Sequence, residues 1–190
     1  MEYTSVNKLY QEAFKKYWDR PAISNYQGMT LHYRDVARRI EKLHIMFEEC
    51  GLAKGDKVAL CSRNQANWAV SFLAAMTYGA VPVPLLHEFK SANIHHLVNH
   101  SEAKILFVDD VIWEGLTETE MPDLQAIIQV NTFKILFASD EKIVDAKTHL
   151  NELFGRKYPE AFTPECLDYY EDSAEELAII NYTSGTSGFS

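Results

Sequence analysis

The chain has 190 residues, of which 47% are hydrophobic and 24% are charged, values that are ordinary for a soluble globular protein. Its formal net charge of −9 disfavours a nucleic acid as the main partner, because a phosphate backbone calls for a basic surface. The charge does not exclude one small bound anion, since backbone N–H groups act at short range.

The cysteines and the chain ends bear on the cellular compartment. Cys50, Cys61 and Cys166 are widely spaced and form no C-x-x-C pair, a pattern typical of reduced cytosolic proteins. The N-terminus lacks the basic and apolar regions of a signal peptide. No run approaches the ~18 apolar residues of a membrane span. We therefore expect a cytoplasmic protein without a transmembrane segment, and leave peripheral membrane association and oligomeric state open.

The first thirty residues predict a helix and then a hairpin. Ser5 is a suitable N-cap, and apolar residues recur behind it at helical spacing. Pro21 ends this helix, and two short extended runs around Gln27-Gly28 predict a β-hairpin. The expected inward face of the helix consists of Val6, Leu9, Tyr10, Ala13, Phe14 and Tyr17.

Helical and extended patterns continue to alternate through the next segment. A helix at about 33–50 precedes a short buried strand at 58–61. Asn64 is the expected cap of the next helix, which ends at Gly79. The run at 80–85 contains two prolines, each of which removes a ladder donor, so we expect a strand end or a sheet edge. The helix before it is expected to turn inward Trp68, Phe72, Ala75 and Met76.

The second half of the chain gives a weaker pattern. Ser91 is the expected cap of a fourth helix, and strands are expected at 104–108 and 126–130. A further strand at 133–137 and a helix at 144–158 are expected beyond them. An acidic cluster then predicts a solvated connector, formed by Asp168, Glu171, Asp172, Glu175 and Glu176.

The order of these elements indicates the fold class. Strands that alternate with helices of roughly 10–15 residues indicate βαβ units and a mainly parallel sheet. We therefore expect an α/β fold of layered sheets with flanking helices. The sequence shows no internal repeat and no domain boundary, so residues 1–190 are taken together as part of one domain.

A loop rich in glycine and hydroxyl groups follows the last apolar run, 177–180, for which we expect a buried strand. The loop offers backbone N–H groups and hydroxyls to an anion and has no carboxylate that would repel it. This chemistry suits a nucleotide phosphate, although a flexible Gly/Ser linker is an equal alternative on loop chemistry alone. The spacing of Gly185 and Gly188 fits neither a Walker A motif nor the dinucleotide fingerprint.

The loop has a specific resemblance. Residues 182–188 read Y-T-S-G-T-S-G and match the first seven positions of Y-T-S-G-[ST]-[ST]-G-x-P-K-G. That motif is the phosphate-binding loop of the adenylate-forming, or AMP-binding, superfamily, which includes acyl-CoA synthetases, luciferases and the adenylation domains of peptide synthetases. Phe189 fills the free position, and Ser190 stands where proline is usual.

Upstream segments extend the resemblance in chain order. Residues 55–60, G-D-K-V-A-L, are similar to the family's G-D-x-V-A-x strand, and 75–84 resemble its A-x-x-x-G-A-V-x-V-P segment. Residues 99–104 are similar to N-D-S-x-A-K, with His100 in place of aspartate. A looser match to T-Y-x-E-L lies at 32–36, where only Tyr33 is identical.

The resemblance implies the N-terminal part of the large domain of an adenylate-forming enzyme, and within the family the chain most resembles long-chain fatty-acid–CoA ligases. Such an acid–thiol ligase uses ATP, with Mg²⁺, to convert a carboxylic acid into an acyl-adenylate and passes the acyl group to coenzyme A. The implied partners are therefore a fatty acid, ATP and coenzyme A, in fatty-acid metabolism. The implied cofactor-binding residues are Thr183, Ser184, Gly185, Thr186, Ser187 and Gly188.

No catalytic residue and no metal ligand is assigned within this chain. The resemblance places the adenine-binding segment, an acidic Mg²⁺ ligand and a catalytic lysine after Ser190, so these 190 residues alone are expected to form no acyl-adenylate. Two alternatives stay open, an aryl- or amino-acid-activating ligase and a non-catalytic α/β interaction domain. His96 and His100 share a helix face, but no residue completes a metal set at known spacing. The absence of a G-x-S-x-G motif disfavours a hydrolase.

Overall fold

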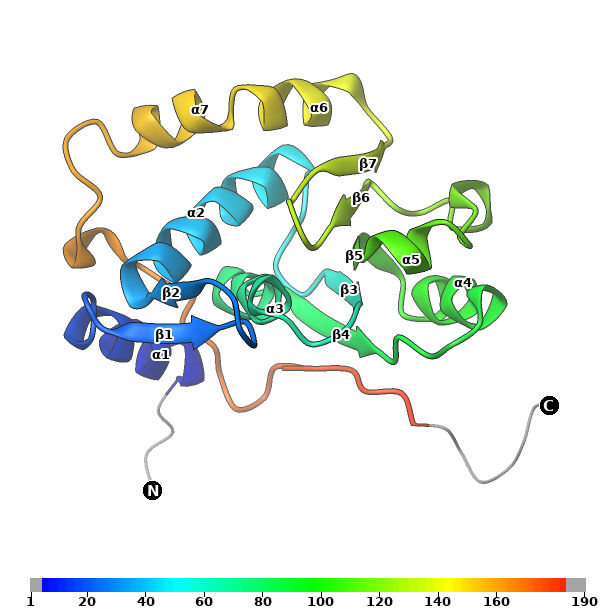
Figure 1. The fold of residues 1–190 in the computed structure, drawn as a ribbon, viewed down its shortest axis with the longest axis horizontal. Coiled ribbons are helices and arrows are strands. Elements are labelled where there is room, and N and C mark those ends of the chain that lie inside the picture. Colours follow the sequence, from blue (N-terminus) through cyan, green and yellow to red (C-terminus); the bar gives the residue numbers. More distant parts are fainter. Residues whose placement is uncertain (1–4, 184–190) are drawn as a thin grey trace.

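The structure is a computed structural model that describes residues 5–183 of the chain (Figure 1). Its centre is a five-stranded sheet with the order β4-β3-β5-β6-β7. The first four of these strands run parallel and β7 pairs antiparallel with β6, so the expected mainly parallel sheet is confirmed. The strands are β3 (Lys57–Cys61), β4 (Val81–Leu85), β5 (Ala103–Val108), β6 (Ala126–Gln129) and β7 (Ile135–Ala138).

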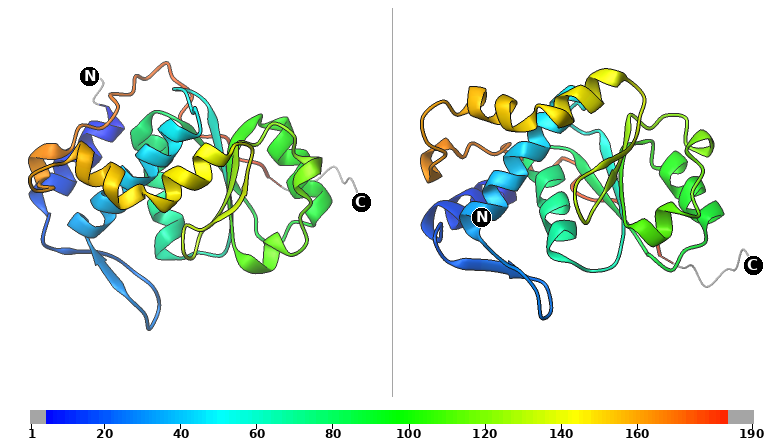
Figure 2. Two further views of the ribbon diagram at one scale, coloured as in Figure 1. Left: turned by 90° about the horizontal axis from the view of Figure 1, so that it is seen from above. Right: turned by 45° about the horizontal axis from the view of Figure 1, so that its top comes forward.

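Both faces of the sheet are covered, because successive side chains of a strand point to opposite faces. Val58 and Leu60 of β3 belong to one hydrophobic cluster, whereas Ala59 and Cys61 belong to the other. The first cluster lies under α1 (Val6–Lys16), α2 (Tyr33–Glu49), α3 (Ala66–Tyr78), α6 (Glu141–Thr148) and α7 (Leu150–Lys157). The second lies under α4 (Ser91–His100), α5 (Asp110–Trp113) and the 3₁₀ turn η1 (Glu118–Glu120). Figures 1 and 2 show α4 and α5 beside the sheet, away from α2 and α7.

Smaller elements complete the fold. The expected hairpin is confirmed as the antiparallel pair β1 (Pro21–Ser24) and β2 (Thr30–His32). A second 3₁₀ turn, η2 (Pro164–Cys166), follows α7. The expected helix at 144–158 is instead two helices, which meet at His149.

Helix α1 begins at the expected Ser5 cap but buries a different face. Its buried residues are Asn7, Gln11 and Phe14, whereas the Leu9 side chain is 56% exposed. Asn7 Nδ2 donates to the Met76 carbonyl at 2.9 Å, and Gln11 Oε1 accepts from the Tyr169 N–H at 2.7 Å. Polar residues that satisfy backbone groups of other segments therefore occupy the inner face, which hydrophobic periodicity does not reveal.

Helix α3 also differs from the expectation. It begins after Gln65 rather than Asn64, and Trp68 and Phe72 are only partly buried, with stacked rings 5.5 Å apart. Met76 is also only partly buried. Small side chains let α3 pack closely against α2 and the sheet, and the buried set is Ala66, Asn67, Val70, Ser71, Ala74, Ala75 and Thr77.

Two other boundaries shift for local reasons. The N-cap of α4 is Lys90 rather than the expected Ser91. Strand β7 starts at Ile135 because Phe133 has a positive φ of 56°, which is incompatible with an extended strand.

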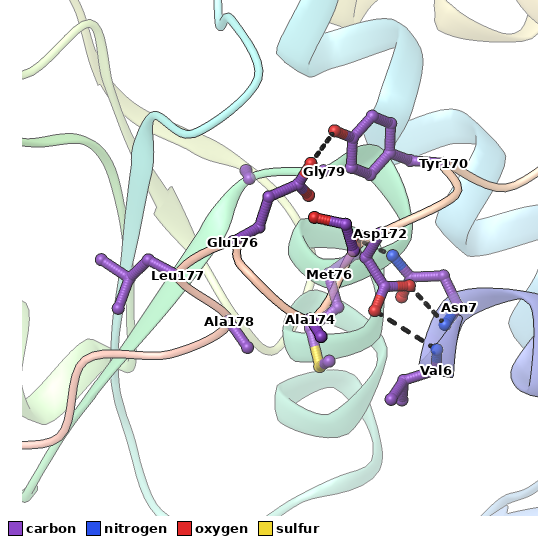
Figure 3. A pocket seen from close by; sticks show the side chains of 12 residues that line it. Val6, Asn7, Met76, Gly79, Tyr170, Asp172, Ala174, Glu176, Leu177 and Ala178 are labelled. Carbon is purple, nitrogen blue, oxygen red and sulfur yellow. Dashed lines mark hydrogen bonds between the residues drawn. The ribbon is translucent and has the colours of Figure 1, made fainter. Parts of the chain in front are cut away.

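The acidic cluster is more than a solvated connector, because Asp172 caps α1 from a distant part of the chain. Its carboxylate accepts from Asn7 N at 2.9 Å and from Val6 N at 3.2 Å (Figure 3). It is also hydrogen-bonded to the Ser5 hydroxyl. A negative charge at a helix N-terminus is favourable. A pocket of about 220 Å³ lies beside this contact. It is lined by Asp172 and its neighbours in the chain, and by Met76 and Gly79.

Candidate functional site

The segment 177–183 runs in extended form beside β4, and the expected buried strand is not formed there (Figure 1). Leu177 is 59% exposed, and one backbone hydrogen bond joins the segment to β4, from Ile180 N to the Pro82 carbonyl at 3.2 Å. Because backbone groups alternate along a strand, Pro82 and Pro84 face the same outer edge, where neither has an N–H to donate. The expectation that the two prolines lie on a sheet edge is confirmed, and they also explain the incomplete pairing.

Tyr182 fixes the end of this segment. Its hydroxyl lies 2.7 Å from His100 Nδ1 on α4, and its ring packs edge-on against the His100 ring and against the second hydrophobic cluster. Burial raises the pKa of the Tyr182 phenol, so it stays protonated at neutral pH. His100, which stands where the family motif has aspartate, thus holds the residue immediately before Thr183.

We expect the Tyr182–His100 contact to contribute about 0.5–1.5 kcal/mol to the stability of the fold, the usual net value of one hydrogen bond. Urea denaturation of Tyr182→Phe, His100→Ala and the double variant measures this coupling energy. His96→Ala is the matched control, because His96 lies one turn earlier on α4 and contacts the His100 ring but not Tyr182. Strictly additive effects of the two substitutions would contradict the assignment.

A pocket of about 330 Å³ opens beside Thr183 at the carboxyl ends of β3 and β4. In open α/β sheets, ligands bind outside the carboxyl ends of parallel strands. The N-terminal part of α3 contributes Trp68, so the positive end of the helix dipole also lies at this pocket. Its walls are Ser62, Asn64, Trp68, Pro84, Leu85, Leu86, His87, Asn181, Tyr182 and Thr183.

The chemistry of the walls suits an anion. Hydroxyl, amide and imidazole groups line the pocket, and no carboxylate does. The neighbouring carboxylate of Asp109 is turned to the backbone, where it accepts from Arg63 N at 3.3 Å and Ile112 N at 3.1 Å. Burial, with the charges of Asp109 and Glu88, raises the pKa of Cys61 to about 12, so this nearby thiol is no nucleophile at neutral pH.

Of the six residues expected to hold phosphate, the described structure contains Thr183, which is exposed at the pocket. Ser184, Gly185, Thr186, Ser187 and Gly188 lie outside the described residues. Sequence reasoning missed the opposite wall, which includes Ser62, Asn64 and His87. Their position in the sequence could have indicated them, because Ser62 directly follows β3 and His87 closely follows β4, and residues that follow parallel strands lie at the same edge of the sheet.

The histidine pair on α4 makes contacts within the protein. The rings of His96 and His100 are 5.9 Å apart, and His100 Nδ1 is engaged with Tyr182. Over residues 5–183, no group of three or more His, Cys, Asp or Glu side chains could hold a metal ion. In the same range, no helix is long and apolar enough to cross a membrane.

Comparison with known proteins decides the family. The sequence profile described as "AMP-binding enzyme" matches residues 10–189. The chain belongs to the AMP-binding enzyme family. The resemblance to adenylate-forming enzymes and the expected α/β fold are both confirmed.

Relatives of this AMP-binding chain include several kinds of enzyme. It is 24% identical over 184 residues to surfactin synthase subunit 2 of Bacillus subtilis, covering 97% of this chain and 4% of the relative. It is 25% identical over 162 residues to fatty acyl-CoA synthetase A of Dictyostelium discoideum, covering 83% and 23%. The chain thus spans less than a quarter of either relative.

Among solved structures, the AMP-binding chain resembles the anthranilate CoA ligase AuaEII in complex with anthranoyl-AMP. The TM-score is 0.74 at 18% identity, and the match covers 98% of this chain and 32% of that one. A likeness at this identity concerns the fold.

Proposed function

We propose that this chain supplies the phosphate-binding loop of an ATP-dependent acid–thiol ligase, which activates a carboxylic acid as acyl-adenylate and transfers the acyl group to coenzyme A. The observation that supports this proposal most directly is the pocket at the carboxyl ends of β3 and β4, which Thr183 lines together with residues that carry no carboxylate. A volume of about 330 Å³ lies within the ~300–1,000 Å³ of small-molecule sites.

The role of the chain's own residues is to position the phosphates. The Thr183 hydroxyl and the Asn181 amide, which line the pocket, would donate hydrogen bonds to phosphate oxygens, and N–H groups of residues 184–188 would add others. When bound, ATP supplies the AMP group that turns a poor leaving group on the acid into a good one. Mg²⁺ would neutralise charge on the phosphates, and the described residues add no three-ligand metal set of their own.

The proposed acid is a long-chain fatty acid, in keeping with the resemblance and with the fatty acyl-CoA synthetase relative. The proposed location is the cytoplasm. A second candidate is an aryl- or amino-acid-activating ligase. It is favoured by the similarity to surfactin synthase and by the fold shared with the anthranilate CoA ligase.

Removing the Thr183 hydroxyl in the full-length protein is expected to lower ATP-dependent thioester formation by about tenfold, the value of one charge-assisted hydrogen bond. Gly185→Ala is expected to lower it at least as much, because a side chain would crowd the backbone that approaches the phosphates. The rate is measured with a panel of fatty, aryl and amino acids.

Ser173→Ala is the matched control, since this exposed hydroxyl lies ten residues before Thr183 in the chain and does not line the pocket beside Thr183. Equal rates for wild type, Thr183→Ala and Gly185→Ala would refute the loop assignment. A preference for aryl or amino acids in the panel would favour the second candidate function, an aryl- or amino-acid-activating ligase.

A further inference from the structure

Another pocket, of about 180 Å³, lies at the edge of the sheet opposite to Thr183. It is enclosed by α2, by β6 and β7 with the turn between them, and by the junction of α6 with α7. Figure 1 shows β7 and α6 at the opposite end of the strand order from β4. Arg39, Lys42 and Lys147 line it, and no carboxylate does. This concentration of positive charge stands out in a chain with a net charge of −9.

Two of these cations, Lys42 and Lys147, make no ion pair in the part of the chain that the structure describes, whereas the charge of Asp35, one turn earlier on α2, favours the charged form of Arg39. Arg39 donates to the neutral Asn67 Oδ1, and Lys42 Nζ donates to the neutral Asn151 Oδ1 at 2.6 Å. Lys147 makes no hydrogen bond or ion pair among residues 5–183. By contrast, Lys8 and Lys157 are each paired with a carboxylate elsewhere on the surface.

The surroundings of these cations disfavour their charge. Burial lowers the pKa of Lys42, and the charges of Arg38 and Arg39 lower it further. Burial and then the charge of Lys42 lower the pKa of Lys147. Half-buried like charges repel one another and lack full hydration, so an anion bound among them would relieve both costs.

The floor of the pocket is apolar, which restricts the ligand further. Phe133 helps form it, with its backbone at a positive φ and its ring edge-on to Phe107 at 6.3 Å. A bulky residue is rarely held in this conformation unless its surroundings enforce it. The apolar lining residues are Leu43, Met46, Ile128, Phe133, Ile135 and Leu150.

We propose that this pocket binds a phosphate monoester with a small apolar ester group. A phosphate dianion matches Lys42 and Lys147, the two lining cations without an ion pair, better than a single carboxylate does, and the apolar group covers the apolar lining. The volume is below the ~300–1,000 Å³ of sites for larger ligands, which excludes a whole nucleotide. The site lies apart from the pocket at Thr183 and does not depend on the proposed ligase activity.

Calorimetric titration of the full-length protein with phenyl phosphate, at low ionic strength, tests the proposal. Saturable binding is expected, tighter than that of inorganic phosphate, which lacks the apolar group, and of benzoate, which carries one charge. Lys42→Gln and Lys147→Gln are each expected to weaken it by about tenfold, whereas Lys147→Arg preserves it.

The controls separate this pocket from general electrostatics and from the Thr183 loop. Lys142→Gln removes an exposed cation of α6 outside the pocket, and Thr183→Ala alters the other phosphate site, so both should leave the affinity unchanged. Without ligand, Lys147→Gln should not lower the thermal midpoint, because it removes a repelling charge. Absence of saturation, or an equal loss in Lys142→Gln or Thr183→Ala, overturns the proposal.

Discussion

Between about pH 6.5 and pH 4.5, the free energy of unfolding is expected to fall by ~2 kcal/mol through His44 alone. His44 lies on α2 and is 6% exposed, and burial together with the positive charges of Lys157 and Lys54 lowers its pKa from 6.5 to about 3. Above pH 6.5 the side chain is neutral in both states. Below it, the unfolded chain gains a proton that the native protein does not take up.

The hydrogen bonds of His44 fix its neutral form. Nε2 lies 3.1 Å from the Ala74 carbonyl and 3.1 Å from Thr77 Oγ1, whose own proton goes to the Leu73 carbonyl. Because a carbonyl can only accept, Nε2 carries the proton and Nδ1 is bare, 3.6 Å from Glu41 Oε1.

Glu41 acts in the opposite direction. Burial raises the pKa of its carboxyl, against the opposing effects of Tyr158 and Lys157. The stability that Glu41 contributes is therefore present at low pH and is lost as the pH rises through its raised pKa. The pH dependence of each residue must be isolated by substitution.

Urea denaturation at several pH values provides the measurement. His44→Gln retains an N–H donor for the Ala74 carbonyl but does not titrate, so its stability should decline less steeply below pH 6.5 than that of wild type. His96→Gln, on the exposed face of α4, should keep the wild-type slope. The same slope in wild type and His44→Gln would show that His44 is not the group responsible.

Gly79→Ala is expected to destabilise the fold by ~2–4 kcal/mol, more than the same change at Gly51. Both glycines follow the ends of helices and have a positive φ, 87° for Gly79 and 69° for Gly51. The free-energy cost of holding alanine in this backbone conformation is therefore similar at the two positions. At Gly51 an added Cβ meets nothing within 4 Å, whereas at Gly79 it would lie 2.8 Å from the Tyr170 ring and from Lys54 Cδ.

The two side chains that an added Cβ at Gly79 would meet differ in how easily they can move. Lys54 has a flexible stem, but Tyr170 is held by a backbone hydrogen bond from its N–H to the Thr77 carbonyl at 3.0 Å and by its hydroxyl on Glu176. The difference in unfolding free energy between the two variants isolates this steric term. Equal losses in Gly51→Ala and Gly79→Ala would mean that Tyr170 moves aside freely.

The sheet was predictable because its strands are short, apolar and bounded by turn residues. Hydrophobic periodicity also found most of the helices. It failed on the inner faces of α1 and α3, where Asn7, Gln11 and Asn67 are buried to satisfy distant backbone groups. Such partners are separated by up to 158 residues, so no local pattern encodes them.

The candidate site likewise has one part that the sequence predicted and one part that it did not. Its loop carries a contiguous motif that can be read directly, and Thr183 is its described member. The opposite wall comes from single residues after β3 and β4, such as Ser62 and His87, which only the sheet order brings to Thr183. The basic pocket of Arg39, Lys42 and Lys147 likewise depends on α6 packing against α2.

The prolines of β4 have a consequence for encounters between molecules. An edge strand normally presents alternating donors and acceptors, which any extended chain can copy into an intermolecular sheet. At Pro82 and Pro84 this edge offers no donor, and the Pro82 carbonyl already accepts from Ile180 N, so a foreign strand would leave its own carbonyls unpaired there. The composition of β4 thus protects the sheet from aggregation through its β4 edge.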